Sequence, residues 1–327
     1  MEKLRPHLAL LLCNAIWAMD FPFYAIVLPR YMGPMGMVAA SLFVAAVISF
    51  IPLGWRWARW YADNRKLAVE NRSARPHAEK VPHEDMRKLV GAALLIGVLR
   101  KSFLMFGLSR TSPIDASIID TIIPILVLVV SVLLGLDKFS RMKIIGLTMG
   151  LAGAVCVVLS GASSVHEKAE LLGNVLIFSS ACVSALYMAL FKRLVAKYKP
   201  ITVIRWIYCV AAIITLPFGL PDIVHADYAN IAHHALFPTL FVLIVPTFFP
   251  NLLLNYGLKY VAPTVTSIYT YLQPVLAIIV SVAMGLDKLH FDTVLFALLI
   301  FIGVGLVLRS YSVHRTLEHP LSQGMRH

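Results

Sequence analysis

The sequence predicts an all-α integral membrane protein of ten transmembrane helices, arranged as two inverted repeats of five helices each. Three observations predict this fold class. Of the 327 residues, 59% are hydrophobic and only 14% are charged. Long apolar runs recur along the whole chain, and one block of sequence occurs twice. So few charged residues could not coat the surface of a soluble globular domain.

The apolar runs are each long enough to cross a bilayer core of about 30 Å as a helix. We expect spans at 8–28, 34–54, 88–108, 112–134, 141–161, 171–191, 201–220, 235–257, 262–285 and 291–310. Helices are expected rather than strands, because a helix pairs all its backbone polar groups within the segment, as lipid requires.

Basic residues set the expected orientation. With the N-terminus in the cytoplasm, most Lys and Arg lie on the inner side, above all in the long loop 55–88. The few on the outer side are Arg30, Arg110, Lys168 and Lys288. This positive-inside bias predicts that both termini are cytoplasmic. It also accounts for the net charge of +12 without a nucleic-acid partner.

The repeated block covers residues 107–138 and 257–288 without a gap. Both copies place Pro, Ser-Ile, Pro, Ser-Val and Gly-Leu-Asp-Lys at matching positions. Five spans per half is an odd number, so the second half must enter the membrane in the opposite orientation. We expect a first repeat at 1–161, which includes the basic loop 55–88, a second repeat at 162–311 and a cytosolic tail at 312–327.

Glycines recur in the fifth and tenth expected spans, where they allow two helix backbones to approach closely. They are Gly146, Gly150, Gly153, Gly303 and Gly305. The pattern favours packing within the bundle over a dimer face, and it leaves both a monomer and a homodimer open.

An apolar helix with a central Pro, a Gly-x-acid-basic turn and a Gly-rich helix occur twice within ten spans. This pattern resembles the drug/metabolite transporter superfamily, and more narrowly its EamA-type ten-span branch. Trp17 matches the aromatic residue usual in the first span of that family. Two features differ: Asp137 and Asp287 stand where Glu is common, and loop 55–88 is longer than usual. The resemblance implies a basket of helices around a central cavity, and export or exchange of small metabolites by alternating access.

Charged residues inside the predicted spans are costly, so each is a candidate functional residue. With a helix rise of about 1.5 Å per residue, Asp20, Arg100, Lys101 and Asp120 are expected at one depth, slightly outside the midplane. We expect them to form one mixed-charge cluster that faces the cavity. Two explanations stay open. Arg100 or Lys101 could simply pair with Asp120, or the charges could contact a charged or zwitterionic solute or carry a proton.

Neutral polar residues are expected to complete the cavity wall. Thr266, Tyr269, Thr270 and Gln273 have the spacing of one helix face, which fits either cavity lining or interhelical hydrogen bonds. The other candidates for this wall are Asn14, Trp17, Tyr187 and Asn255.

Pro124 and Pro274 interrupt the fourth and ninth expected helices. A proline in a helix removes one backbone hydrogen bond, so each is either a gating hinge or a static kink.

Nothing in the sequence favours an enzyme, since it has no Walker loop, no GxSxG and no HExxH motif. The cysteines have no metal-ligand spacing, and we expect neither a metal nor another cofactor. Membrane lipids are an expected partner, whereas nucleic acid is not.

The expected function is a secondary transporter in the bacterial inner (plasma) membrane. It would export a small organic metabolite, such as an amino acid or a related polar or amphipathic solute, driven by a proton or counter-solute gradient. A carrier of nucleotide-sugars or lipid-linked sugars is the alternative, and an intramembrane enzyme is a third possibility.

Overall fold

The computed structural model describes residues 4–64, 77–135, 140–160 and 167–285, and individual positions between 291 and 309. Within those residues every regular element is a helix. The first half contains α1 (Arg5–Val27), α2 (Pro34–Asn64), α3 (His83–Ala92), the π-helical η2 (Ala93–Leu99), α4 (Arg100–Leu108), α5 (Pro113–Asp120), α6 (Ile123–Leu133) and α7 (Arg141–Ser160).

The second half contains a longer series of shorter elements. They are α8 (Glu167–Leu190), α9 (Lys192–Lys197), α10 (Pro200–Val224), α11 (Tyr228–Asn230), the π-helical η4 (Ile231–Ala235), α12 (Leu236–Tyr260), α13 (Pro263–Ile268), the 3-10 turn η5 (Tyr269–Tyr271) and α14 (Leu272–Ala283).

Seven helical segments in the described part of the chain are long and apolar enough to cross a membrane. They are Arg5–Val27, Pro34–Asn64, His83–Leu108, Pro113–Leu133, Glu170–Leu190, Pro200–Val224 and Tyr228–Tyr260. Two of the other expected spans correspond to α7 and to α13 through α14. The third, 291–310, is described only in part. The count of ten and the inner location of both termini therefore stay predictions.

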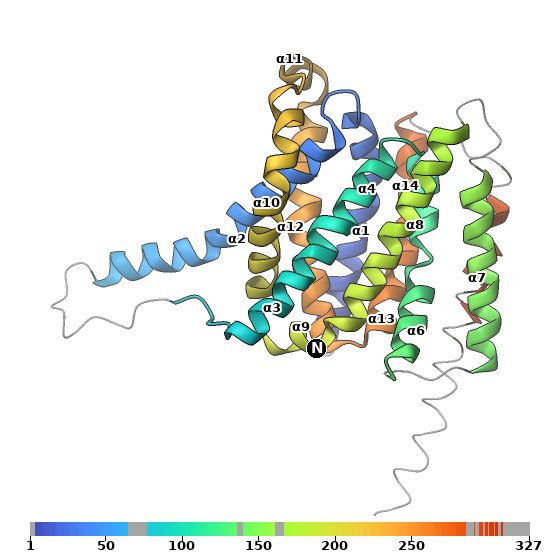
Figure 1. Ribbon diagram of the computed structural model, residues 1–327, viewed down its shortest axis with the longest axis horizontal. Helices are drawn as coiled ribbons and strands as arrows, with labels where there is room; N and C mark the ends of the chain where they lie inside the picture. The colour runs from blue at the N-terminus through green and yellow to red at the C-terminus, as the bar shows by residue number, and fades with distance from the viewer. Residues whose placement is uncertain are drawn as a thin grey trace, which may run out of the picture.

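The helices pack as one bundle, with α1 in the interior against α12 and α14 (Figure 1). The most extensive helix pair is α2 with α10, and α7 lies at one edge of the bundle (Figure 1). The C-terminal part of α2 extends beyond the expected span 34–54 and leaves the bundle. Trp55, Trp57 and Tyr61 are exposed there. Exposed Trp and Tyr are typical of the membrane–water interface.

The two copies of the repeated block have the same local structure. Helices α5 and α13 both begin at a proline, and Gly135 and Gly285 both adopt positive φ, +68° and +66°. Only glycine adopts this conformation without strain. The chain is also interrupted in both copies between the first helix and the second, α6 or α14.

The two copies lie antiparallel in the bundle. Helix α5 packs against α14 and α6 packs against α13, so the start of each copy lies beside the end of the other. Accordingly, α6 and α14 lie towards opposite ends of the molecule (Figure 1). The Asp-Lys pairs of the two turns, Asp137-Lys138 and Asp287-Lys288, fall outside the described residues.

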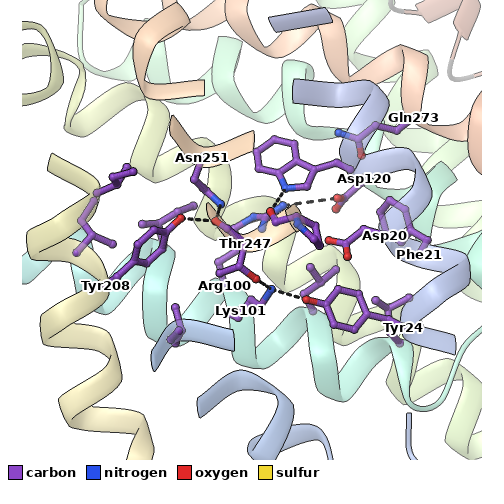
Figure 2. Close-up of a pocket in the computed structure, with 18 of the residues that line it drawn as sticks. Asp20, Phe21, Tyr24, Arg100, Lys101, Asp120, Tyr208, Thr247, Asn251 and Gln273 are labelled. Atoms are coloured by element: carbon purple, nitrogen blue, oxygen red, sulfur yellow. Dashed lines mark hydrogen bonds and ion pairs between the residues drawn. The ribbon is translucent and has the colours of Figure 1, made fainter. Parts of the chain in front are cut away.

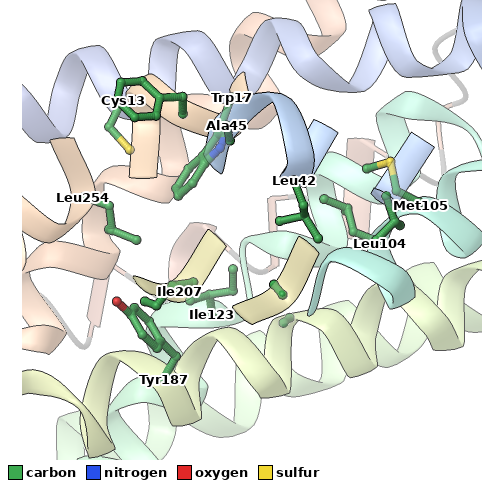
Figure 3. Close-up of a cluster of buried hydrophobic side chains, with 14 of the residues drawn as sticks. Cys13, Trp17, Leu42, Ala45, Leu104, Met105, Ile123, Tyr187, Ile207 and Leu254 are labelled. Carbon is green, nitrogen blue, oxygen red and sulfur yellow. The ribbon is translucent and has the colours of Figure 1, made fainter. Parts of the chain in front are cut away.

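A contiguous apolar cluster fills the space between α1, α4, α8, α10 and α12 (Figure 3). Trp17, Leu104, Tyr187, Ile207 and Leu254 are among its buried side chains. This packing surrounds the polar groups described below and separates them from lipid.

Glycines join α7 to the helical residues near the C-terminus. A Cβ at position 303 would lie 2.5 Å from the carbonyl oxygen of Gly146 and 2.7 Å from the backbone nitrogen of Gly150. Neighbouring Gly305, by contrast, has open space on its side-chain face. Gly146, Gly150 and Gly303 thus form an intramolecular helix contact, as expected for packing within the bundle.

We expect Gly303→Ala to destabilise the protein by about 1–3 kcal/mol, because the added methyl group has no room between two backbones. Gly305→Ala is the matched control and should change stability by less than about 0.5 kcal/mol. Thermal unfolding of both variants in detergent measures the difference. Equal midpoints for the two variants would contradict this helix contact.

Candidate functional site

A polar cavity lies at the centre of the bundle, between α1, α4, α10 and α12 (Figure 2). Its lining combines charged, amide, hydroxyl and aromatic side chains. The lining residues are Trp17, Asp20, Phe21, Tyr24, Leu42, Ile96, Arg100, Lys101, Leu104, Leu108, Asp120, Ile204, Ile207, Tyr208, Pro246, Thr247, Asn251, Asn255 and Gln273.

The cavity is narrow in this conformation. Its volume is about 30 Å³, which has room for about two water molecules. A larger molecule can therefore bind only if lining side chains or helices move apart.

A π-helical segment precedes the two cations of the cavity. At the end of η2 the backbone N–H of Arg100 donates to the carbonyl of Leu95, five residues earlier. The wider turn changes the register of the residues that follow it, and π-helical turns are frequent at functional sites. Arg100 and Lys101 come directly after it, and both are buried.

Arg100 contacts three elements of the bundle. Its Nε donates to Ser184 Oγ at 2.5 Å, its Nη2 lies 3.9 Å from Asp120 Oδ2, and its guanidinium lies over the Trp17 ring at 5.3 Å. Within the described residues, no acceptor lies within hydrogen-bond distance of its terminal nitrogens. The flat end of the guanidinium is thus available to a ligand.

Lys101 is held more completely. Its Nζ donates to Tyr24 Oη at 2.7 Å and to Thr247 Oγ1 at 3.0 Å, and it lies 5.0 Å from the centre of the Tyr24 ring. Lys101 therefore links α4 to both α1 and α12. Its neighbour Arg100, with fewer bonds, is the more accessible of the two cations.

Both carboxylates of the cavity have an oxygen without a partner. Asp20 Oδ1 and Asp120 Oδ1 are buried and accept no hydrogen bond from the described part of the protein. Figure 2 shows the two side chains on the same side of the cavity, across from Tyr208 and Asn251. A buried acceptor left unpaired is costly, so these oxygens are available to a donor group of a ligand.

The break between the end of α5 and the start of α6 places Asp120 in the cavity. Pro124 has no N–H to donate to the Asp120 carbonyl four residues earlier, and the backbone tightens there to bonds from Thr121 to Ile118 and from Ile122 to Ile119. The expected span 112–134 is therefore two helices, with Asp120 as the last residue of the first. A gating hinge and a static kink at Pro124 and Pro274 both stay predictions.

Neutral polar groups of α12 cover the opposite wall. Asn251 Nδ2 donates to the Thr247 carbonyl at 2.9 Å, and the hydroxyl of Tyr208 donates to the same carbonyl. Asn255 accepts a bond of 2.6 Å from Tyr187. These bonds fix the α12 side chains in place around the charged groups.

The structure places seven of the predicted site residues on the cavity wall. They are Trp17, Asp20, Arg100, Lys101, Asp120, Asn255 and Gln273. Two others lie directly behind the wall and are bonded to residues that line it. Tyr187 donates a hydrogen bond to Asn255, and Asn14 accepts a bond of 2.6 Å from Gln273.

The remaining three predicted residues, Thr266, Tyr269 and Thr270, do not line this cavity. Their spacing with Gln273 gives one face only on a continuous α-helix, and the 3-10 turn η5 interrupts the helix at Tyr269. Tyr269 instead forms a hydrogen bond of 2.6 Å with His7.

Sequence reasoning missed Tyr24, Thr247 and Tyr208. Tyr24 follows Trp17 and Asp20 at helical spacing, and Thr247 precedes Asn251 and Asn255 at steps of four residues. Both signals lie in the sequence. Tyr208 has one such neighbour, Arg205, three residues earlier. Among the described residues no group of three His, Cys, Asp or Glu side chains could hold a metal ion.

Comparisons with known proteins agree on one family. The model of the EamA-like transporter family matches residues 4–159 and again residues 171–309. An uncharacterized transporter of Archaeoglobus fulgidus is 24% identical over 300 residues, 92% of this chain and 96% of its own. The uncharacterized transporter YyaM of Bacillus subtilis is 22% identical over 231 residues, 69% of this chain and 75% of its own.

A solved crystal structure has the same fold. It aligns with a TM-score of 0.56 at 16% identity, and the alignment covers 92% of this chain and 96% of the other.

The Arg100–Asp120 contact predicts a stability cycle. Arg100→Gln should destabilise the protein by about 3 kcal/mol, because it leaves two buried carboxylates facing one cation. The double variant Arg100→Gln/Asp120→Asn should regain most of that loss. Thermal unfolding of the two single variants and the double variant tests the coupling. A double variant whose loss equals the sum of the single losses would show that the two residues are energetically independent.

Proposed function

Because the chain belongs to the EamA-like transporter family, we propose that it is a secondary transporter that exports a small organic metabolite by alternating access. Family membership and the transporter relatives make the protein a transporter rather than an enzyme, with a small-molecule substrate and a lipid environment. It is a multi-pass membrane protein, and its bacterial relatives point to the inner membrane. Substrate, direction and coupling are the parts we propose.

The observation that supports a substrate class is the set of groups left open in the cavity. Among the described residues, no acceptor lies within hydrogen-bond distance of the Arg100 terminal nitrogens, and Asp20 Oδ1 and Asp120 Oδ1 accept no hydrogen bond. A zwitterion such as an amino acid complements both, with its carboxylate on the guanidinium and its ammonium between the carboxylates. With Lys101 included, two cations face two carboxylates, which suits a solute of no net charge.

The same balance disfavours the alternative substrates. A nucleotide-sugar or a lipid-linked sugar brings several negative charges, and Asp20 and Asp120 would repel them. Lys101, already bonded to Tyr24 and Thr247, offers little compensation. In this proposal Lys101 helps to hold the site together, and Arg100 is the cation that contacts the solute.

The narrow cavity supports movement during transport, because a metabolite cannot enter the space present here. We propose two five-helix repeats, 1–161 and 162–311, that move relative to each other around the site, with both termini and the tail 312–327 in the cytoplasm. Asn14, Tyr187, Thr266, Tyr269 and Thr270 would support the wall or line it in another conformation. A proton or counter-solute gradient would drive export by a monomer or a homodimer.

Transport by purified protein in liposomes tests the function. A panel of amino acids, amines, organic acids and nucleotide-sugars, with and without a pH gradient, should reveal saturable transport of a zwitterion. Arg100→Gln should reduce its kcat/KM at least about 100-fold, as expected for a lost bidentate charge contact of about 3 kcal/mol. Thr239→Val, at a buried hydroxyl away from the cavity, is the control and should retain transport.

Transport of nucleotide-sugars but not zwitterions would contradict the proposed substrate class. If no solute of the panel moves although Thr239→Val and the unmodified protein are folded, the transporter proposal itself fails for these solutes. Loading the solute on either side of oriented vesicles then decides between export and import.

A further inference from the structure

A second charged cluster lies at one end of the bundle, away from the cavity. Asp85, in the first turn of α3, accepts bonds on Oδ2 from Lys197 Nζ at 2.5 Å and from the Tyr198 hydroxyl at 2.6 Å. Its Oδ1 accepts a bond of 3.1 Å from Lys88. The Asp85 side chain is 9% exposed, whereas those of Lys88 and Lys197 are more than half exposed. The buried carboxylate of Asp85 thus accepts bonds from two lysines whose side chains are largely exposed.

The cluster continues to the end of α12. Lys259 Nζ donates to the Tyr198 carbonyl at 2.8 Å, and Lys192 Nζ donates to the carbonyls of Leu258 and Val261. These contacts join the start of α3, the α9–α10 connection and the α12–α13 connection. We call Asp85, Lys197, Tyr198 and Lys259 the inner clasp. Helices α3 and α9 lie at the end of the bundle where the chain begins, which is the expected cytoplasmic end (Figure 1).

The inner clasp connects the two halves of the protein. Asp85 belongs to the first family match, 4–159, and its donors Lys197 and Tyr198 belong to the second, 171–309. Helix α3 packs against α10 and only slightly against α9, and the bonds of Asp85 add polar contacts to this junction. Hydrogen bonding to Asp85 raises the pKa of Lys197 and of Tyr198, so both stay protonated donors at neutral pH.

The contact between the halves at the other end is of a different kind. There the Gly36 N–H donates to Asp222 Oδ2, and a Cβ at Gly219 would lie 2.6 Å from the Met35 carbonyl oxygen. Helices α2 and α10 touch backbone to backbone along this contact, so it keeps the two repeats together at this end. The inner clasp, by contrast, joins long side chains, whose hydrogen bonds can break without prying apart two backbones in direct contact.

We propose that Asp85 is a gating residue, whose bonds to Lys197 and Tyr198 close the inner side of the cavity and break when that side opens. The inference rests on the proposed alternating-access function. Two further hydrogen bonds join α1 to the second half. Asn14 is bonded to Gln273 at the cavity, and His7 is bonded to Tyr269 nearer the start of α1. Both bonds would break in the same movement. Loss of the inner clasp should therefore expose the inner half of α1.

Cys13 is a natural reporter of that exposure. It is fully buried between α1 and α12, where its thiol donates to the Pro250 carbonyl at 3.2 Å. It lies about 12 Å along the helix from the start of α1, on the inner side of Asp20. With Cys156, Cys182 and Cys209 replaced by Ala, Cys13 is the one remaining thiol of the chain. Its reaction with a membrane-impermeant methanethiosulfonate reagent in inside-out vesicles measures inner opening.

Asp85→Asn should raise the rate of Cys13 modification about tenfold, because it removes the charge that holds Lys197. Glu84→Gln is the matched control, because it removes the same charge from the same helical turn. Glu84 is exposed, and it makes no such bond to the part of the chain that the structure describes. Its rate should match that of the unmodified protein. Equal rates in Asp85→Asn and Glu84→Gln would overturn the proposal.

A charge reversal covers the case in which Asp85→Asn folds poorly. Asp85→Lys alone should raise the modification rate, and Asp85→Lys/Lys197→Asp should return it towards the original value. A double variant that stays as reactive as Asp85→Lys would count against the inner clasp. Because labelling needs no known substrate, a failed solute panel with a responsive Cys13 rejects the proposed solutes and not the inner clasp. Transport with an unresponsive Cys13 rejects the inner clasp alone.

Discussion

The burial of four charges among apolar helices constrains the centre of this protein. Each of Asp20, Arg100, Lys101 and Asp120 would be costly alone, and they are tolerable together because cations and carboxylates compensate one another. The compensation is uneven. Lys101 is bonded to α1 and α12 at once, whereas Arg100 reaches Asp120 only at 3.9 Å. The cluster thus contains one structural cation and one that remains open to a ligand.

Backbone irregularities concentrate around the same groups. The π-helical η2 immediately precedes Arg100, the α5–α6 break follows Asp120, and the 3-10 turn η5 immediately precedes α14, which carries Gln273. Broken helices at mid-membrane depth are tolerated where they line a cavity, since protein or water can then satisfy the freed groups. Irregular backbone and buried charge therefore occur together for one reason: both require a polar cavity.

The sequence was sufficient for properties that depend on local pattern. Apolar runs located seven long helices of the described residues, although α2 continues to Asn64 and the segment expected from 235 begins at Tyr228. Helix rise placed Asp20, Arg100, Lys101 and Asp120 together, because depth along a straight helix depends only on residue number. The direction in which each side chain points around the helix axis was harder to predict, because η2 and η5 alter the helical register in ways that hydrophobicity does not reveal. The face expected from Thr266 to Gln273 was lost for that reason. Asp85 escaped notice because its partners come from a distant connection.

The two copies of the repeated block are alike in local backbone structure. They share their prolines, their breaks and their glycine caps at Gly135 and Gly285, so the scaffold is nearly symmetric. Its chemistry is not, since Asp120 corresponds to Thr270.

The two ends of the bundle also differ in chemistry. Asp85 is bonded to Lys197 and Tyr198 at one end, whereas Ala235, near α11 at the other end, lies in a small apolar cluster with Tyr31 and Ile231. Local backbone structure is therefore alike in the two copies of the repeated block, while the side chains that join the halves are not.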